Sequence, residues 1–186
     1  MGRGVLMNTV LQSLRELFID KTIKNVKYNL FLFTFGSIGG WVIETIFRSL
    51  YSGYLVIPGF LNGPWCPIYG LGITLAIHLC EGKNVADSFI RLFAGATILE
   101  WVTSVFFERF THRLLWDYSI MPLSTGSRIN IIFSILWGLM GLFLLYVIEP
   151  QLKKFFECYP AFLTISECLV VFFFIDCIIK FLLVFA

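Results

Sequence analysis

Long apolar runs are the feature that most constrains this chain. A helix that crosses a hydrocarbon core of ~30 Å needs about 20 apolar residues, and the sequence has several such runs. Of the 186 residues, 58% are hydrophobic and only 14% are charged, which is too little charge for the surface of a soluble domain. We therefore predict an all-α, polytopic membrane protein with a single integral membrane domain over residues 1–186. Its transmembrane helices should number about five, over residues 29–47, 67–79, 89–107, 129–148 and 161–185.

The residues before the first run differ from the transmembrane bundle expected over residues 28–186. Residues 5–19 place apolar side chains such as Leu6 and Val10 near one helical face and polar side chains elsewhere. This pattern is typical of an amphipathic helix that lies in the membrane interface. We therefore predict that residues 1–27 form a cytoplasmic amphipathic helix and a basic segment. The alternative is a soluble helix that packs on the protein's own loops.

The basic residues predict the orientation of the chain. Nine of them lie on one side of a five-span arrangement, namely Arg3, Arg15, Lys21, Lys24, Lys27, Lys83, Arg91, Lys153 and Lys154. Loops rich in Lys and Arg stay in the cytoplasm, so the N-terminus should be cytoplasmic and the C-terminus outside. The loops of the other side contain arginine and no lysine. The planar fork of arginine fits a carboxylate or a phosphate.

A segment rich in glycine and proline, GFLNGPWCPIYGLG at residues 59–72, lies between the first two runs. Irregular backbone survives at membrane depth only when it is buried in protein or lines a wet cavity. The helix that follows has about thirteen to fifteen residues, or ~20–22 Å at 1.5 Å per residue, so residues 53–67 should complete the crossing as a re-entrant element. Free N–H groups at the start of that helix could bind an anion together with Arg48 and Arg128. A plain outer loop rich in turn residues is the alternative.

Charged residues inside the apolar runs indicate a functional site, because a charge in hydrocarbon costs at least ~2.5–3.5 kcal/mol. Glu44 and Glu100 lie within runs, and further charges map to the same outer half. We predict a polar chamber that opens outward and binds its ligand through Glu44, Arg48, Asn62, Gly63, Tyr69, Glu100, Arg109, Arg113, Asp117 and Arg128. The alternative is solvated loops with local ion pairs, since Glu44 and Arg48 have i,i+4 spacing. Asp176 and Lys180 share that spacing and should form a structural pair or contact another subunit.

The sequence contains few other patterns that point to chemistry. Its five cysteines form no CxxC pair and no Cys/His cluster with metal spacing, so we predict no metal site and no cofactor. No nucleic-acid signature and no ATPase motif are present, and any ATP-driven activity would need a second protein. A carboxylate–His pair could do acid–base work, and Glu108, His112 and Asp117 are the candidates. Whether the chain is an enzyme is left open.

Several short motifs, in their order and spacing, resemble a known family. They are WVIE at residues 41–44, the long glycine and proline motif, LEW at residues 99–101, Glu108, WDYS at residues 116–119 and SILWG at residues 134–138. Over about residues 30–150 the chain resembles the bacterial ABC-transporter type IV, or CmpB-like, family. The family usually has Asn-Arg where this chain has Ile57-Pro58, and Asn where it has Ser124 and Gly126. The resemblance implies a permease-like protein of the bacterial cytoplasmic membrane.

We interpret the chain as a small membrane transport component. Its outward-facing chamber would bind an anionic or zwitterionic small molecule or a lipid headgroup. Five spans are few for a complete pore, so a homo-oligomer, an ATPase or another membrane subunit is expected. Two alternatives stay open. One is an intramembrane enzyme that acts on a lipid headgroup, and the other is a non-catalytic subunit that regulates or stabilises another membrane protein.

Overall fold

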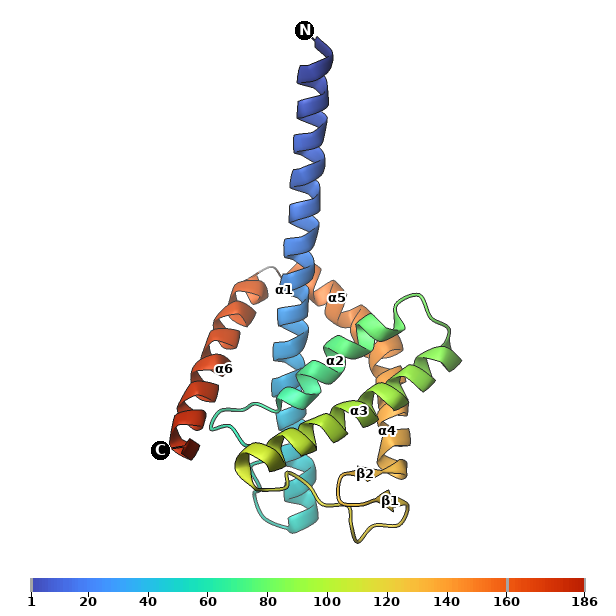
Figure 1. Cartoon of the computed structure of the whole chain (residues 1–186), viewed down its shortest axis with the longest axis vertical. Coiled ribbons are helices and arrows are strands. Elements are labelled where there is room, and N and C mark those ends of the chain that lie inside the picture. The colour runs from blue at the N-terminus through green and yellow to red at the C-terminus, as the bar shows by residue number, and fades with distance from the viewer. Residues whose placement is uncertain (1, 160, 186) are drawn as a thin grey trace.

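The protein is a bundle of helices with one long helix that extends beyond it (Figure 1). The computed structural model describes the backbone of residues 2–159 and 161–185, and side chains from residue 22 to residue 159 and from residue 161 to residue 184. Its elements are α1 (Gly2–Ser52), α2 (Pro67–Cys80), α3 (Val85–Thr111), β1 (Ser124–Thr125), β2 (Ile129–Asn130), α4 (Ile131–Phe143), the π-helical turn η1 (Leu144–Ile148), α5 (Glu149–Cys158) and α6 (Ala161–Phe185). The all-α prediction therefore holds apart from the two-residue strands of one antiparallel hairpin.

Three helical stretches have the length and hydropathy of membrane spans among the described residues. They are Thr22–Ser52, Val85–Thr111 and Ile131–Cys158. The second predicted run forms α2, which has 14 residues and is as short as expected. The fifth forms α6, a helix of 25 residues that includes Glu167, Asp176 and Lys180. The chain is therefore a membrane protein by the composition of its helices, and the arrangement with five spans remains a prediction.

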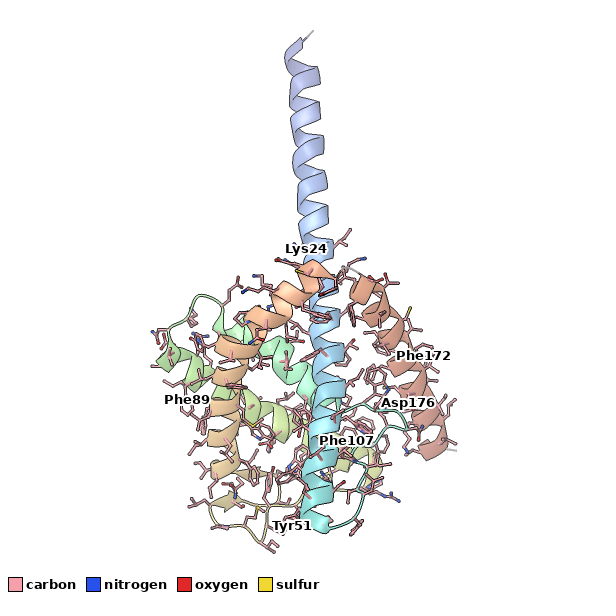
Figure 2. All side chains as sticks on the ribbon, turned by 180° about the vertical axis from the view of Figure 1, so that it is seen from behind. Lys24, Tyr51, Phe89, Phe107, Phe172 and Asp176 are labelled. Carbon is pink, nitrogen blue, oxygen red and sulfur yellow. The ribbon has the colours of Figure 1, made fainter. Side chains whose placement is uncertain are left out.

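The first helix differs from the prediction because it does not break at the basic segment. It continues from Gly2 to Ser52 without interruption, so the interfacial segment and the first span form one helix. The amphipathic face predicted for residues 5–19 depends on side chains outside the described part. Lys24 lies near one end of the bundle and Tyr51 near the other (Figure 2). Helix α5 lies toward the same end of the bundle as Lys24. So does the loop that connects α2 and α3 (Figure 1).

The fourth run was expected to end at residue 148, but the helix does not stop there. The helix continues through the proline as α5, after the π-helical turn η1. Proline has no N–H to donate, and its ring clashes with the carbonyl group four residues earlier. The wider π turn that precedes Pro150 removes the need for that bond and keeps the helix continuous. Residues of α5 then reach α1, where Phe31, Leu32, Leu152 and Phe156 form a buried cluster.

Glycines allow α1 and α2 to approach closely. A Cβ atom at Gly70 would lie 2.4 Å from the carbonyl oxygen of Phe33, and one at Gly40 would lie 2.3 Å from the ring of Tyr69. Gly36 faces the same contact, with the Cα atom of Gly70 2.9 Å from its added Cβ. Glycines at such a contact let two membrane helices pack closely.

Helix α6 holds the glycine- and proline-rich segment against the bundle. The Asp176 carboxylate accepts hydrogen bonds from the backbone N–H of Gly63 at 2.8 Å and from the side-chain amide of Asn62 at 2.9 Å. Lys180 donates to the amide oxygen of Asn62 at 3.2 Å, and its ammonium lies 5.3 Å from the ring centroid of Phe60. Figure 2 shows Asp176 on α6 beside this segment. Asp176 and Lys180 therefore bind the segment, and within the described residues no ion pair joins them directly.

We expect Gly70→Ala to destabilise the contact between α1 and α2. The new methyl group would overlap a backbone carbonyl, so the free energy of unfolding should fall by about 1–3 kcal/mol. Gly39→Ala is the matched control, because nothing lies within 4 Å of a Cβ added there. Thermal unfolding in detergent measures both variants, and equal midpoints for the two would contradict the close approach.

We expect Asp176→Ala to release the segment at residues 60–66. Hydrogen bonds to a charged group contribute about 1.5–3 kcal/mol, so amide hydrogen exchange in this segment should become at least about tenfold faster. Glu167→Ala is the control, because Glu167 lies on the same helix and pairs with Lys27 instead. Unchanged exchange at Asn62 and Gly63 in the Asp176 variant would show that α6 does not hold the segment.

Candidate functional site

A cavity of about 550 Å³ lies between α1, α2, α3 and the α4–η1 stretch. Most of its wall is apolar, with side chains such as Ile73, Leu92 and Met140. Helices α1 and α4 lie on two sides of it, with α2 and α3 behind them in Figure 2. The polar side chains of the wall are Glu44, Arg48, Tyr69, Glu100, Trp116, Tyr118 and Trp137. A volume of this size is within the usual range for a small-molecule site, ~300–1,000 Å³.

The first polar group of the cavity is the ion pair between Glu44 and Arg48. One oxygen of Glu44 accepts from Arg48 Nη2 at 2.6 Å and from Arg48 Nε at 2.8 Å. The other oxygen lies 3.6 Å from the thiol of Cys66, which donates to it, and the hydroxyl of Tyr69 lies against the same carboxylate. The local pair expected from the i,i+4 spacing is therefore formed. It also faces the cavity, as the predicted site requires.

The second polar group is Glu100, which is only 6% exposed. Its Oε1 atom accepts from the indole N–H of Trp137 at 3.0 Å and from the hydroxyl of Tyr118 at 3.3 Å. Its Oε2 atom is buried and has no hydrogen-bond partner in the part of the chain that the structure describes. A buried carboxylate is thus held in place through one oxygen while the other remains unpaired.

Aromatic side chains connect these two groups. The rings of Tyr69 and Trp137 make an edge contact with their centroids 6.0 Å apart, and Tyr118 stacks on Phe133 at 5.0 Å. Burial, followed by the charge and the hydrogen bond of Glu100, raises the pKa of Tyr118 above its ordinary value. Its hydroxyl therefore keeps its proton at neutral pH and remains a donor to Glu100.

Four of the other predicted residues meet at a second, smaller cavity of about 320 Å³. Its wall contains Glu108, Arg109, His112 and Arg128. Arg128 forms an ion pair with Glu108, and its backbone carbonyl accepts from the indole N–H of Trp116 at 3.1 Å. The residues predicted to form one chamber therefore line two separate cavities, because Glu44, Arg48 and Glu100 belong to the larger one.

The remaining predicted residues lie at neither cavity. Asn62 and Gly63 bind Asp176, as described above. Arg113 and Asp117 are exposed, and Asp117 accepts from the backbone N–H of Ser119 at 2.8 Å. Hydrogen bonds from Ser119 lower the pKa of Asp117 below its ordinary value, so its carboxylate stays ionised at neutral pH. No group of three metal-ligating side chains occurs within the described residues.

Sequence reasoning missed Trp116, Tyr118 and Trp137 as site residues. A signal for them was present, because they belong to the WDYS and SILWG motifs that carry the family resemblance. It also missed Asn130, which is 1% exposed. The Asn130 side chain accepts from two backbone N–H groups at the start of α4 and donates to the Pro122 carbonyl at 2.8 Å and to Ser124 Oγ at 2.9 Å. It thereby fixes the connection that brings Tyr118 to the cavity.

The comparison with protein families agrees with the motifs that meet in this cavity. The model of the family described as "Putative ABC-transporter type IV" matches residues 31–181. The chain belongs to this family. The match extends into α6, as far as residue 181, beyond the range in which the motifs were found. No curated protein and no solved structure matches the chain.

We expect Trp137→Phe to destabilise the protein by about 1–3 kcal/mol. The substitution keeps an aromatic ring but removes the N–H that Glu100 accepts, and a buried acceptor that loses a donor costs that much. Trp101→Phe is the control, because Trp101 follows Glu100 on α3 and is 50% exposed. Thermal unfolding in detergent compares the two, and equal stability would show that the bond to Glu100 contributes little.

Proposed function

We propose that this protein is a membrane transport component that takes an amphiphilic ligand into the cavity between α1, α2, α3 and α4. Membership of a family described as an ABC-transporter type supports the role in transport. The choice of an amphiphilic ligand rests on the cavity wall, which contains both apolar and charged side chains. Most of the wall is apolar, while Glu44, Arg48 and Glu100 supply charge within it.

The wall fits an amphiphile for a simple physical reason. An acyl chain gains free energy on contact with apolar surface, and a charged headgroup needs the hydrogen bonds that the polar groups supply. Two carboxylates at membrane depth are costly, and the bundle provides donors to both. A ligand that binds these carboxylates would explain why they are present at membrane depth.

We propose that the ligand enters from the side of the bilayer, between α1 and α4. Residues of both helices line the cavity, among them Ile43 on α1 and Met140 on α4. Both side chains are more than half exposed. Figure 2 looks on to the face where these two helices lie beside each other. A lipid could therefore move its chain between them without leaving the membrane.

The wider setting of the protein follows from the same proposal. The chain would cross a bacterial cytoplasmic membrane five times, with its N-terminus inside, its C-terminus outside and residues 53–67 as a re-entrant element. The ligand group would be anionic or zwitterionic, with Arg48 binding its anionic part. An ATPase or a further membrane subunit would supply energy, and a homo-oligomer would complete the transport path.

An intramembrane enzyme is the second candidate, and the side-chain contacts favour it less. Glu108 is engaged by Arg128, and Asp117 is fully accessible and held in its ionised form. Glu108 lines the smaller cavity with its carboxylate already paired, and Asp117 lies at neither cavity. The third candidate, a regulatory subunit, would bind its partner through the exposed faces of the bundle. It would not need charged side chains inside the cavity.

We expect a phospholipid or a similar amphiphile to remain bound when the protein is purified in mild detergent. Native mass spectrometry should detect it in a stoichiometric complex. Arg48→Ala should reduce the bound fraction about tenfold, since a charge-assisted hydrogen bond contributes about 1.5–3 kcal/mol.

Arg113→Ala is the matched control, because Arg113 is exposed and lines neither cavity. It should retain the ligand fully. Equal retention by the two variants would contradict the proposed site. A co-purified protein without any amphiphile would favour the regulatory subunit.

A further inference from the structure

Glu100 lines the cavity, and one of its two carboxylate oxygens has no hydrogen-bond partner within the described residues. Oε1 already accepts from Trp137 and Tyr118, whereas Oε2 is buried without a partner among the residues that the structure describes. The residue is 94% removed from solvent, since only 6% of it is exposed. A buried acceptor without a donor is costly, and a buried charge more so. A ligand that brings a donor to Oε2 would remove that cost.

The surroundings of Oε2 favour a cation as the donor. Trp137 and Tyr118 direct their N–H and O–H to the same carboxylate, and Tyr69 and Trp116 also line the cavity. The charged side chains of the wall are two carboxylates, Glu44 and Glu100, and one guanidinium, Arg48. Since Arg48 already neutralises Glu44, the carboxylate of Glu100 is the one left to attract a positive group.

The same contacts distinguish between kinds of cation. An unpaired carboxylate oxygen accepts from an N–H or O–H donor, and among cationic headgroups a primary ammonium has N–H groups whereas a quaternary ammonium has none. Arg48 can also bind the anionic group of a ligand. Glu44 contacts only two of its three side-chain nitrogen atoms, Nε and Nη2. Neither of these contacts uses the Nη1 atom of Arg48, which can therefore donate to a ligand. The Arg48 side chain is 43% exposed, so a ligand can reach it.

We propose that the cavity selects a zwitterionic amphiphile whose primary ammonium group donates a hydrogen bond to Oε2 of Glu100 and whose anionic group binds Arg48. This inference rests on the proposed function and names the ligand class of the same cavity. A lipid with a phosphoethanolamine headgroup has this chemistry. Its apolar chain would occupy the part of the cavity lined by Ile73, Ala76 and Leu92.

The test compares headgroups on identical acyl chains. Delipidated protein in detergent is incubated with phospholipids that carry ethanolamine, N-methylated ethanolamine, choline or glycerol, and native mass spectrometry measures the bound fraction of each. The ethanolamine lipid should bind about tenfold more tightly than the choline lipid, because the choline headgroup cannot donate to Oε2. The glycerol lipid, which has no cation, should also bind more weakly.

Two variants connect any preference to Glu100. Glu100→Gln keeps the shape of the side chain and an acceptor for Trp137 but removes the negative charge, and it should abolish the preference for ethanolamine over choline. Glu108→Gln on the same helix should keep the preference, because Glu108 lines the other cavity. If Glu100 simply held a proton on Oε2, Glu100→Gln would keep the preference, and the proposal would be overturned.

The outcomes separate this inference from the proposed function. If the native chain binds ethanolamine and choline lipids equally well, the ammonium contact is wrong while the lipid cavity stands. If no lipid binds in any arm, the proposed function itself fails, and this inference with it. Because the headgroup series uses the native chain, a failure of Glu100→Gln to fold would leave this first comparison decisive.

Discussion

The cost of placing a carboxylate in apolar surroundings determines much of this structure. Glu44 and Glu100 lie in helices that are otherwise rich in apolar residues, and an ionised group at membrane depth is unfavourable unless partners surround it. Each carboxylate therefore gathers donors, and at least one donor to each comes from another element. Glu44 is bound by Arg48 and by the thiol of Cys66, and Glu100 by Tyr118 and Trp137. These contacts tie α1 to the segment before α2, and α3 to α4 and the connection that precedes it.

The cavity exists because backbone geometry keeps the helices at specific distances. Gly40 and Gly70 let α1 and α2 approach closely, and the π-helical turn before Pro150 lets the α4–α5 stretch continue toward α1. Helix α6 adds a further constraint, because Asp176 holds the segment that leads to Cys66 and α2. Changes far from the cavity wall, at α6 or at Asn130, can therefore alter the position of the charged groups.

The sequence predicted the parts of this structure that depend on local patterns. Apolar runs predicted the helices, the short run predicted α2, and i,i+4 spacing predicted the pair of Glu44 and Arg48. Charges inside the runs predicted Glu44 and Glu100 as ligand-binding residues, which stays a prediction, and both line the larger cavity. Periodicity and spacing report on one element at a time, and these features lie within single elements or follow from the cost of charge in lipid.

Other features depend on contacts between distant segments, which no local pattern encodes. The sequence could not show that Asp176 binds Asn62 and Gly63, because the alternative pairing with Lys180 has equally good spacing. It treated the outer charges as one chamber, whereas Glu108 and Arg128 pair at a second cavity. It also ended the fourth run at residue 148, whereas a π turn lets the helix continue through Pro150. In each case a tertiary contact or a backbone adjustment replaced the local expectation.

The most direct test of this account is to locate the ligand chain inside the bundle. A phospholipid with a photoreactive diazirine at the end of its acyl chain can be crosslinked to the protein in bilayer nanodiscs, and the modified residues mapped by mass spectrometry. The account predicts crosslinks at Ala76 and Leu92, which line the cavity and are only 6% and 5% exposed. Crosslinks confined to outward-facing residues such as Ile98 and Val102 would show that lipid only surrounds the protein and would contradict a ligand-binding cavity.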